Sequence, residues 1–306
     1  MAEPHQAVLV QRLQRRRVVP ILTVDVFTER PFLGNPVAVV LDADALSTET
    51  MQRIARWTNL SETTFVVRPD DAEADYGLRI FTPESELPFA GHPTLGSAAA
   101  AIAAGRVAPR DGRLVQACAA GRVPLRVEAG GTRLHFQVPA SRIEPLTVQD
   151  IAALAEALGL GDTLSGVERI DVGAVWLTAA LPSAAALLAL QPDLAALDAL
   201  SRRHRATGVT LYATHPPGTV GADGVPLDVE VRSFAPAAGV PEDPVCGSGN
   251  ACVALQRRAG LGPRPYIAAQ GAAIGRAGRI SVGYRGDAVE IGGATVVCAR
   301  GLLRVD

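Results

Sequence analysis

The chain has 306 residues, of which 48% are hydrophobic and 20% charged, so it is long enough for two domains of ordinary size. Its formal net charge is −2 and its arginines are spread along the sequence, so no basic surface for nucleic acid is predicted. No stretch approaches the roughly 18 uninterrupted apolar residues of a membrane-spanning helix, and no membrane association is expected.

The chain contains no lysine, because all 29 of its cationic side chains are arginine. A pyridoxal Schiff base needs a lysine amine and a phosphate-binding P-loop uses one, so neither is predicted. The four cysteines and five histidines lack the spacing of a metal site, and we expect neither a metal nor another cofactor. Cysteines without such pairing or a signal peptide favour a cytoplasmic setting.

Residues 1–17 come before the first strand-like pattern and contain a basic run without an apolar segment, which predicts a solvated N-terminal extension. After a β-like stretch at 36–40, an amphipathic helix is predicted to begin near Leu46. The same spacing of apolar residues returns at Leu146, where a second helix with a capping-box-like start is expected. We interpret the two helices as equivalent parts of a duplicated unit.

The strongest internal similarity lies in two later segments with the pattern Arg-x-Phe-x-Pro. Residues 79–83 have this pattern and lead into a glycine turn at Gly91, and residues 232–236 repeat it before a turn at Gly247. A helix is predicted after each turn, at about 93–104 and 250–259, stopped by the glycine that follows. Such a duplication predicts two similar halves that face each other across a cleft.

The composition shifts between residues 117 and 131, which places the boundary of the halves there and gives segments at 18–128 and 129–306. The second Arg-x-Phe-x-Pro segment begins 153 positions after the first, whereas the helices are 100 apart, so the later half carries roughly 50 extra residues. We expect them between 161 and 205, where an Ala/Leu-rich helix is predicted at 184–200.

Each glycine turn would expose the unpaired N–H groups of the helix that follows, which stabilise a nearby anion by about 0.3–2 kcal/mol. If the halves face each other, Gly91 and Gly247 can hold one carboxylate, so the expected substrate is a small carboxylate. The alternative is that both glycines only form turns. The segment from Gly247 to Cys252 is a poor dinucleotide fingerprint because a cysteine replaces its third glycine.

Three titratable side chains lie beside these turns. Glu62 follows the first amphipathic helix, and desolvation in a cleft would raise its pKa, so that it can take and return a proton. Asp243 can hydrogen-bond a substrate hydroxyl or amine, and a helix start suits a neutral imidazole at His92. The alternatives are an exposed loop glutamate, a turn-forming Asp-Pro pair and a histidine that only caps its turn.

Cys246 comes just before the second helix start, where the pKa of a thiol can fall enough for reactivity. The matching residue of the first turn is Ala90. A proton relay between two thiols is therefore not predicted at these positions.

These motifs resemble those of the PhzF-like family of phenazine-biosynthesis isomerases, within the diaminopimelate epimerase superfamily. The resemblance covers nearly everything from Val18 onward and is carried by five segments: Val-Asp-Val-Phe at 24–27, Gly-Asn-Pro at 34–36, Leu-Ser-Glu-Thr at 60–63, Gly-His-Pro-Thr-Leu-Gly at 91–96 and Glu-Asp-Pro-Val-Cys-Gly-Ser at 242–248. It implies an α+β fold of two pseudo-symmetric halves, each a β-barrel-like sheet around a central helix. It also implies a cofactor-independent site between the halves and a homodimer.

The resemblance assigns the general acid/base to Glu62, with His92 and Asp243 as its catalytic companions. It places Ser248, Gly91 and Gly247 of the two turns at the substrate, and we add Cys246 as a candidate substrate-binding residue. The family's usual threonine before the Gly-Ser pair is a cysteine here. This is the position of a catalytic thiol in related two-cysteine epimerases.

The leading hypothesis is therefore a cofactor-free isomerase in which Glu62 moves a proton between carbons of a small carboxylate. A second hypothesis is an amino-acid racemase or epimerase in which Cys246 is one of the bases. A third is a non-catalytic protein that binds small acids.

Overall fold

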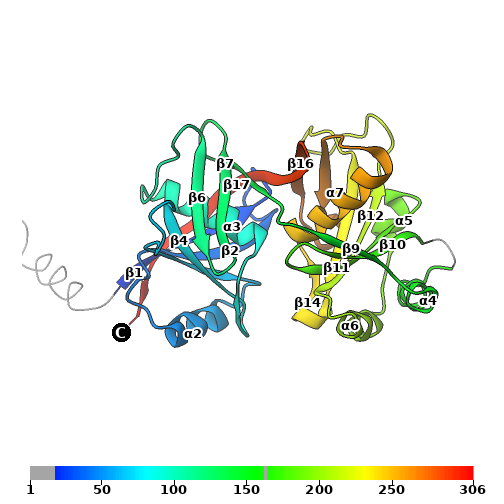
Figure 1. The fold of residues 1–306 in the computed structure, drawn as a ribbon, viewed down its shortest axis with the longest axis horizontal. Helices are drawn as coiled ribbons and strands as arrows, with labels where there is room; N and C mark the ends of the chain where they lie inside the picture. The colour runs from blue at the N-terminus through cyan, green and yellow to red at the C-terminus, as the bar shows by residue number, and fades with distance from the viewer. Residues whose placement is uncertain (1–17, 162–163, 306) are drawn as a thin grey trace, which may run out of the picture.

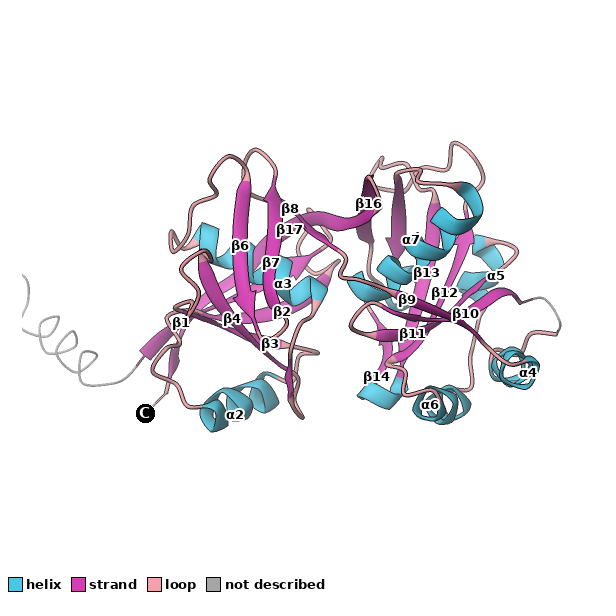
Figure 2. Ribbon diagram, viewed as in Figure 1, coloured by secondary structure: helices cyan, strands magenta, loops and turns pink. Residues whose placement is uncertain are grey.

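The computed structural model describes residues 18–161 and 164–305, so the expected extension at 1–17 lies outside the described residues. Two lobes lie side by side, and the first and last described strands end together on the first lobe (Figure 1). Strands surround a helix in each lobe (Figure 2), which confirms the expected α+β fold. No helix of the described residues is long and apolar enough to cross a membrane.

The described strands of the first lobe form a closed barrel of eight. Their order by hydrogen bonding, with β17 returning to β1, is β1 (Val18–Val26), β2 (Asn35–Val40), β3 (Thr63–Val67), β4 (Tyr76–Phe81), β6 (Arg113–Cys118), β7 (Gly121–Val127), β8 (Arg133–Gln137) and β17 (Ala288–Arg304). Helix α3 (Gly91–Ala103) fills this barrel, and all of it except its last two residues is buried. Its small side chains permit this, and a Cβ added at Gly96 would lie 2.3 Å from Val37.

The second lobe repeats this plan around α7 (Gly247–Leu261), which contacts β10, β11, β12, β16 and β17. Its strands are β9 (Arg142–Pro145), β10 (Ser165–Asp171), β11 (Val175–Ala180), β12 (Gly208–Thr214), β13 (Val229–Ala235), β15 (Tyr266–Gln270) and β16 (Gly278–Arg285), joined by the start of β17. Two short strands, β5 (Glu86–Leu87) and β14 (Val240–Asp243), pair with β4 and β13 just before the glycine turns.

The outer helices correct one expectation about the duplication. Helix α2 (Thr48–Thr58) connects the parallel strands β2 and β3, and its counterparts between parallel β11 and β12 are α5 (Ala184–Ala189) and α6 (Leu194–Arg203). The helix near Leu146, α4 (Val148–Ala157), lies instead between antiparallel β9 and β10, so its equivalence with α2 is wrong. The two resemble each other because both have a side-chain N-cap and one apolar face, as any helix packed on a sheet has.

The estimate of roughly 50 extra residues in the later half fails with that equivalence. The later half has α4 between β9 and β10, and it has two helices between β11 and β12 where the first lobe has α2 alone. The single helix expected at 184–200 is two helices. Pro192 lies between them, where its ring and missing N–H prevent a continuous helix.

The central helices begin earlier than the sequence predicted, at Gly91 and Gly247. Gly105 follows the end of α3 with a φ of 66°, as expected. The expected stop at Gly260 is wrong, because α7 continues to Leu261 and ends at Gly262, whose φ is 75°. A glycine inside a helix costs only about 1 kcal/mol, so the buried face of α7 can carry the helix past it.

Strand β17 joins the two lobes. Its first residues pair with β16 and with β8, and the residues from Thr295 to Arg304 pair with β1 in the first lobe. The division of the chain into halves at 18–128 and 129–306 stays a prediction. Although β8 and the end of β17 come after residue 128, they pair with the first-lobe strands β7 and β1.

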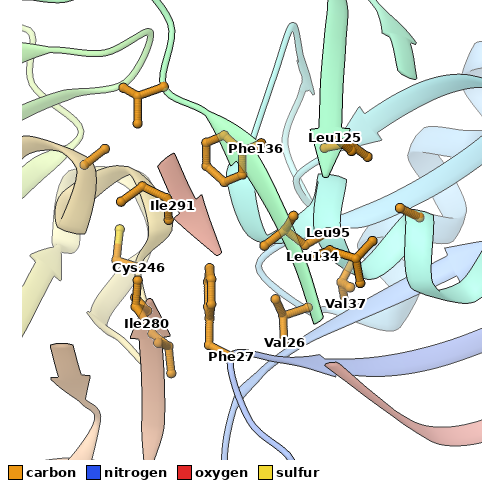
Figure 3. Packing of buried hydrophobic residues seen from close by; sticks show 14 of the residues in the cluster. Val26, Phe27, Val37, Leu95, Leu125, Leu134, Phe136, Cys246, Ile280 and Ile291 are labelled. Carbon is orange, nitrogen blue, oxygen red and sulfur yellow. The ribbon is translucent and has the colours of Figure 1, made fainter. Parts of the chain in front are cut away.

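The hydrophobic core is continuous between the lobes. Phe27, which follows β1, is fully buried and lies near Cys246, Ile280 and Ile291 of the second lobe (Figure 3). Phe27 has a φ of 66°, uncommon for a bulky residue, so the surrounding packing holds this turn in place. The starts of both central helices are thereby fixed relative to each other.

Candidate active site

The starts of α3 and α7 lie next to each other where the lobes meet. A Cβ atom added to Gly247 would lie 3.7 Å from the backbone nitrogen of His92, in the first turn of α3. A Cβ added to Gly91 would lie 2.7 Å from the ring of Phe136, so any larger residue there requires a shift. Two helix starts with unpaired N–H groups thus share one region, an arrangement that suits an anion.

Glu62 lies in the short turn between α2 and β3. The helix ends at Asn59, whose φ of 54° is left-handed, and the hydroxyl groups of Thr58 and Thr63 are 2.6 Å apart across the turn. The parallel pairing of β3 with β2 fixes where the strand starts. The glutamate side chain is only 16% exposed and points at α3.

The imidazole of His92 faces this carboxylate. Nε2 of His92 lies 3.4 Å from Oε2 of Glu62, and neither atom has a hydrogen-bond partner within residues 18–161 and 164–305. Burial lowers the pKa of His92 below its ordinary 6.5, although the charge of Glu62 opposes this, so the ring is neutral at pH 7. A buried polar atom without a partner costs about 1–3 kcal/mol, so a ligand that hydrogen-bonds to these two atoms removes a penalty of the free protein.

Asn35, at the start of β2, connects these groups to the second lobe. Its amide nitrogen donates to Oδ1 of Asp243 at 3.0 Å and to the Val245 carbonyl at 3.0 Å, and it lies 3.4 Å from Nδ1 of His92. Burial, and then repulsion by Glu62, raises the pKa of Asp243 to about 7. At neutral pH this carboxyl group is therefore about half protonated and can donate as well as accept a hydrogen bond.

Cys246 is the N-cap of α7 and not an activated thiol. Its Sγ accepts a hydrogen bond from the Gly249 N–H at 3.2 Å, and its own N–H donates to Oε1 of Gln270 at 3.1 Å. Burial, with Asp243 nearby, raises the pKa of the thiol well above its ordinary value. A thiol that stays protonated is a poor base.

Ser248 lies in the first turn of α7 and is held by Trp176. The indole N–H of the buried Trp176 on β11 donates to the Ser248 hydroxyl oxygen at 2.9 Å. Because the indole can only donate, the serine proton is left to point elsewhere. Ser248 can thus donate to an anion at the helix starts.

The structure brings Glu62, His92 and Asp243 together and lays the residues of both glycine turns beside them. Sequence reasoning gave no role to Asn35 or Trp176. Asn35 stands in the Gly-Asn-Pro motif, which was a usable signal, whereas nothing in the local sequence marks Trp176 as the partner of a serine 72 positions later.

No group of three or more potential metal ligands is present among the described residues. Two surface hollows among the described residues, of about 530 and 500 Å³, are lined by none of the site's side chains.

Comparison with known proteins identifies the family. The family model described as phenazine biosynthesis-like protein matches residues 24–301. The chain belongs to the phenazine biosynthesis-like family. A trans-2,3-dihydro-3-hydroxyanthranilate isomerase of Pseudomonas aeruginosa is 37% identical over 299 residues, which cover 92% of this chain and 97% of that protein. The expected enzyme class, an isomerase of the PhzF-like type, is confirmed by such relatives.

Two other proteins similar to this chain come from a yeast and from a further bacterium. A Schizosaccharomyces pombe protein named antisense-enhancing sequence 1 is 42% identical over 239 residues, covering 76% of this chain and 78% of that protein. A crystal structure of a PhzF-family phenazine biosynthesis protein from Bacillus anthracis matches with a TM-score of 0.81 at 23% identity, covering 94% of this chain and 99% of that one. The likeness to that structure supports the two-lobed fold.

Proposed function

We propose that this isomerase moves a proton between two carbons of a small carboxylate, with Glu62 as the general acid/base. The observation that carries the proposal is the buried, unpartnered pair of Glu62 Oε2 and His92 Nε2 beside two helix starts. An ionised carboxylate in this place can take a proton from carbon and return it to another carbon, which leaves the enzyme unchanged after each turnover.

The substrate carboxylate would lie at the starts of α3 and α7, where Ser248 and the backbone N–H groups after Gly91 and Gly247 can donate to it. Charge that develops on the substrate as the proton leaves would be stabilised by donors already in place, at about 3 kcal/mol for each well-aimed donor. Neutral His92, and Asp243 in its protonated form, are further donors that need no additional proton from solvent.

The named relatives suggest the substrate class to test first. Because trans-2,3-dihydro-3-hydroxyanthranilate isomerases align over nearly the whole chain, we propose cyclic, partly unsaturated amino or hydroxy acids as candidates. A panel of such acids is screened in deuterium oxide for exchange of carbon-bound hydrogen. Glu62→Gln is compared with Glu156→Gln, on the exposed face of α4, as a matched control.

The expected result is exchange by the wild type and by the control, and loss of exchange with retained binding in Glu62→Gln. Full exchange activity in Glu62→Gln would refute the assignment. The racemase alternative is disfavoured by the buried, protonated thiol of Cys246. Thermal stabilisation by an acid with neither a shifted double bond nor deuterium incorporation across the panel would support the binding-protein alternative instead. The homodimer stays a prediction, and sedimentation of the full chain tests it.

A further inference from the structure

In each lobe the Arg-x-Phe-x-Pro segment forms a bidentate arginine–glutamate pair beside a phenylalanine ring, and the proposed chemistry uses neither arginine. On β4, Arg79 donates from Nε and from one terminal nitrogen to the two carboxylate oxygens of Glu86 on β5, both at 2.7 Å. Its guanidinium carbon lies 5.2 Å from the centre of the Phe81 ring. We call this set of arginine, glutamate and phenylalanine the first clasp.

The second clasp has the same three kinds of side chain, and its ion pair is more deeply buried. On β13, Arg232 donates to both carboxylate oxygens of Glu242 on β14, at 2.9 and 2.8 Å, and lies 4.8 Å from the Phe234 ring centre. Its other terminal nitrogen donates to the carbonyls of Leu187 and Leu190. The ion-paired side chains are 5% and 10% exposed, against 30% and 35% in the first clasp.

Only the second clasp contains a residue that is adjacent in sequence to a candidate catalytic residue. Glu242 immediately precedes Asp243, whereas Glu86 lies six positions before His92. The ladder between β13 and β14 is irregular, with Ser233 opposite Asp243 and a shift before the next pair. Asp243, the last residue of this short, irregular strand, is held by hydrogen bonds from Asn35 and Gln270, and the bidentate Arg232–Glu242 contact fixes the preceding residue to β13.

We propose that Arg232 is a positioning residue that, by holding Glu242, sets the place of the Asp243 carboxyl group against Glu62 and the substrate. Arg79 has no comparable effect on the site, because its ion pair is about one-third exposed and Glu86 is more distant along the chain from His92. The proposal rests on the proposed function for what Asp243 does in catalysis. One of its two tests, the titration of the Asp243 carboxyl group, requires no catalysis.

The matched variants are Arg232→Lys and Arg79→Lys. Lysine keeps the charge but lacks the planar fork, so it cannot engage both carboxylate oxygens in the same way. In Arg232→Lys we expect kcat for exchange to fall about 10- to 100-fold with a smaller change in KM, because a misplaced catalytic group loses rate steeply. In Arg79→Lys the change should stay below about threefold.

The second readout is the titration of the Asp243 carboxyl carbon by NMR, assigned with Asp243→Asn. In the wild type and in Arg79→Lys it should titrate near pH 7. In Arg232→Lys the midpoint should move toward the ordinary value, because a displaced carboxyl group gains water. If the wild type catalyses no exchange, the proposed function fails, yet this titration still decides the role of Arg232.

If Arg232→Lys does not fold, Arg232→Met/Glu242→Met replaces it, since removing both members of a buried ion pair is tolerated better than removing one. Glu242→Gln alone is its control, because it removes the charge beside Asp243 and keeps a hydrogen-bond partner for Arg232. A lower Asp243 midpoint in the double variant than in Glu242→Gln supports the proposal. Equal midpoints, or an Arg232→Lys variant whose folded fraction has wild-type kcat and titration, overturn it.

Discussion

Asp243 makes the stability of the folded protein depend on pH in a defined direction. Its pKa is raised from 3.8 to about 7, first by burial and then by the charge of Glu62. The native state therefore binds one more proton than the unfolded state between these two values, and the free energy of unfolding falls as pH rises through this window. With about 1.4 kcal/mol for each pKa unit, this group lowers stability at pH 8, relative to pH 4, by up to about 4 kcal/mol.

Asp243→Asn removes the charge and keeps an oxygen that can accept from Asn35 and from the Val245 N–H. The variant should gain stability over the wild type at pH 8 and show little difference at pH 4 to 5. Urea unfolding at both pH values measures this, with Asp70→Asn, on the exposed surface, as control. If the stability difference between Asp243→Asn and the wild type is the same at both pH values, the carboxyl group is not perturbed and the account of its environment is wrong.

Two further predictions concern the glycine turns. Cys246→Ser should keep the exchange rate within about threefold of wild type, because serine is a favoured N-cap and no thiolate is required; a loss of a hundredfold or more, measured by deuterium exchange, would favour the racemase hypothesis. Gly91→Ala should destabilise the fold by about 1–3 kcal/mol through its clash with Phe136. Gly247→Ala, whose added Cβ meets only ordinary contacts at 3.4 Å and beyond, should cost less, and a reversed order in thermal unfolding would contradict the packing argument.

Local patterns in the sequence predicted elements well where the decisive interactions are local. The helix start near Leu46 was confirmed, and the central helices were found within three residues of their predicted starts, because caps, apolar spacing and glycine act within a few residues. The equivalence of the helices near Leu46 and Leu146 failed because an amphipathic pattern says that a helix packs on a sheet, and not which strands it connects. Topology depends on the parallel or antiparallel pairing of distant strands.

The site shows the same limit. Glu62 and His92 are 30 positions apart, and their contact follows from the pairing of β3 with β2 and the burial of α3. The role of Asn35 depends on Asp243, more than 200 positions later, and no spacing rule in one sequence connects the two. The crossing of β17 between lobes is equally non-local. Nothing in the sequence of this long strand indicates where its pairing with β16 and β8 ends and its pairing with β1 begins.

In the proposed reaction a single carboxyl group, Glu62, carries hydrogen between two carbons of one substrate. Its most direct test is position-resolved NMR of a turned-over substrate in deuterium oxide, with wild type and Glu62→Gln at ligand concentrations that saturate both. In the wild type we expect a shifted double bond, with deuterium at the receiving carbon in each turnover in which the Glu62 proton exchanges with solvent, and in Glu62→Gln neither a shifted double bond nor deuterium at any carbon. Deuterium only at one stereocentre that inverts, or incorporation that persists in Glu62→Gln, would contradict it.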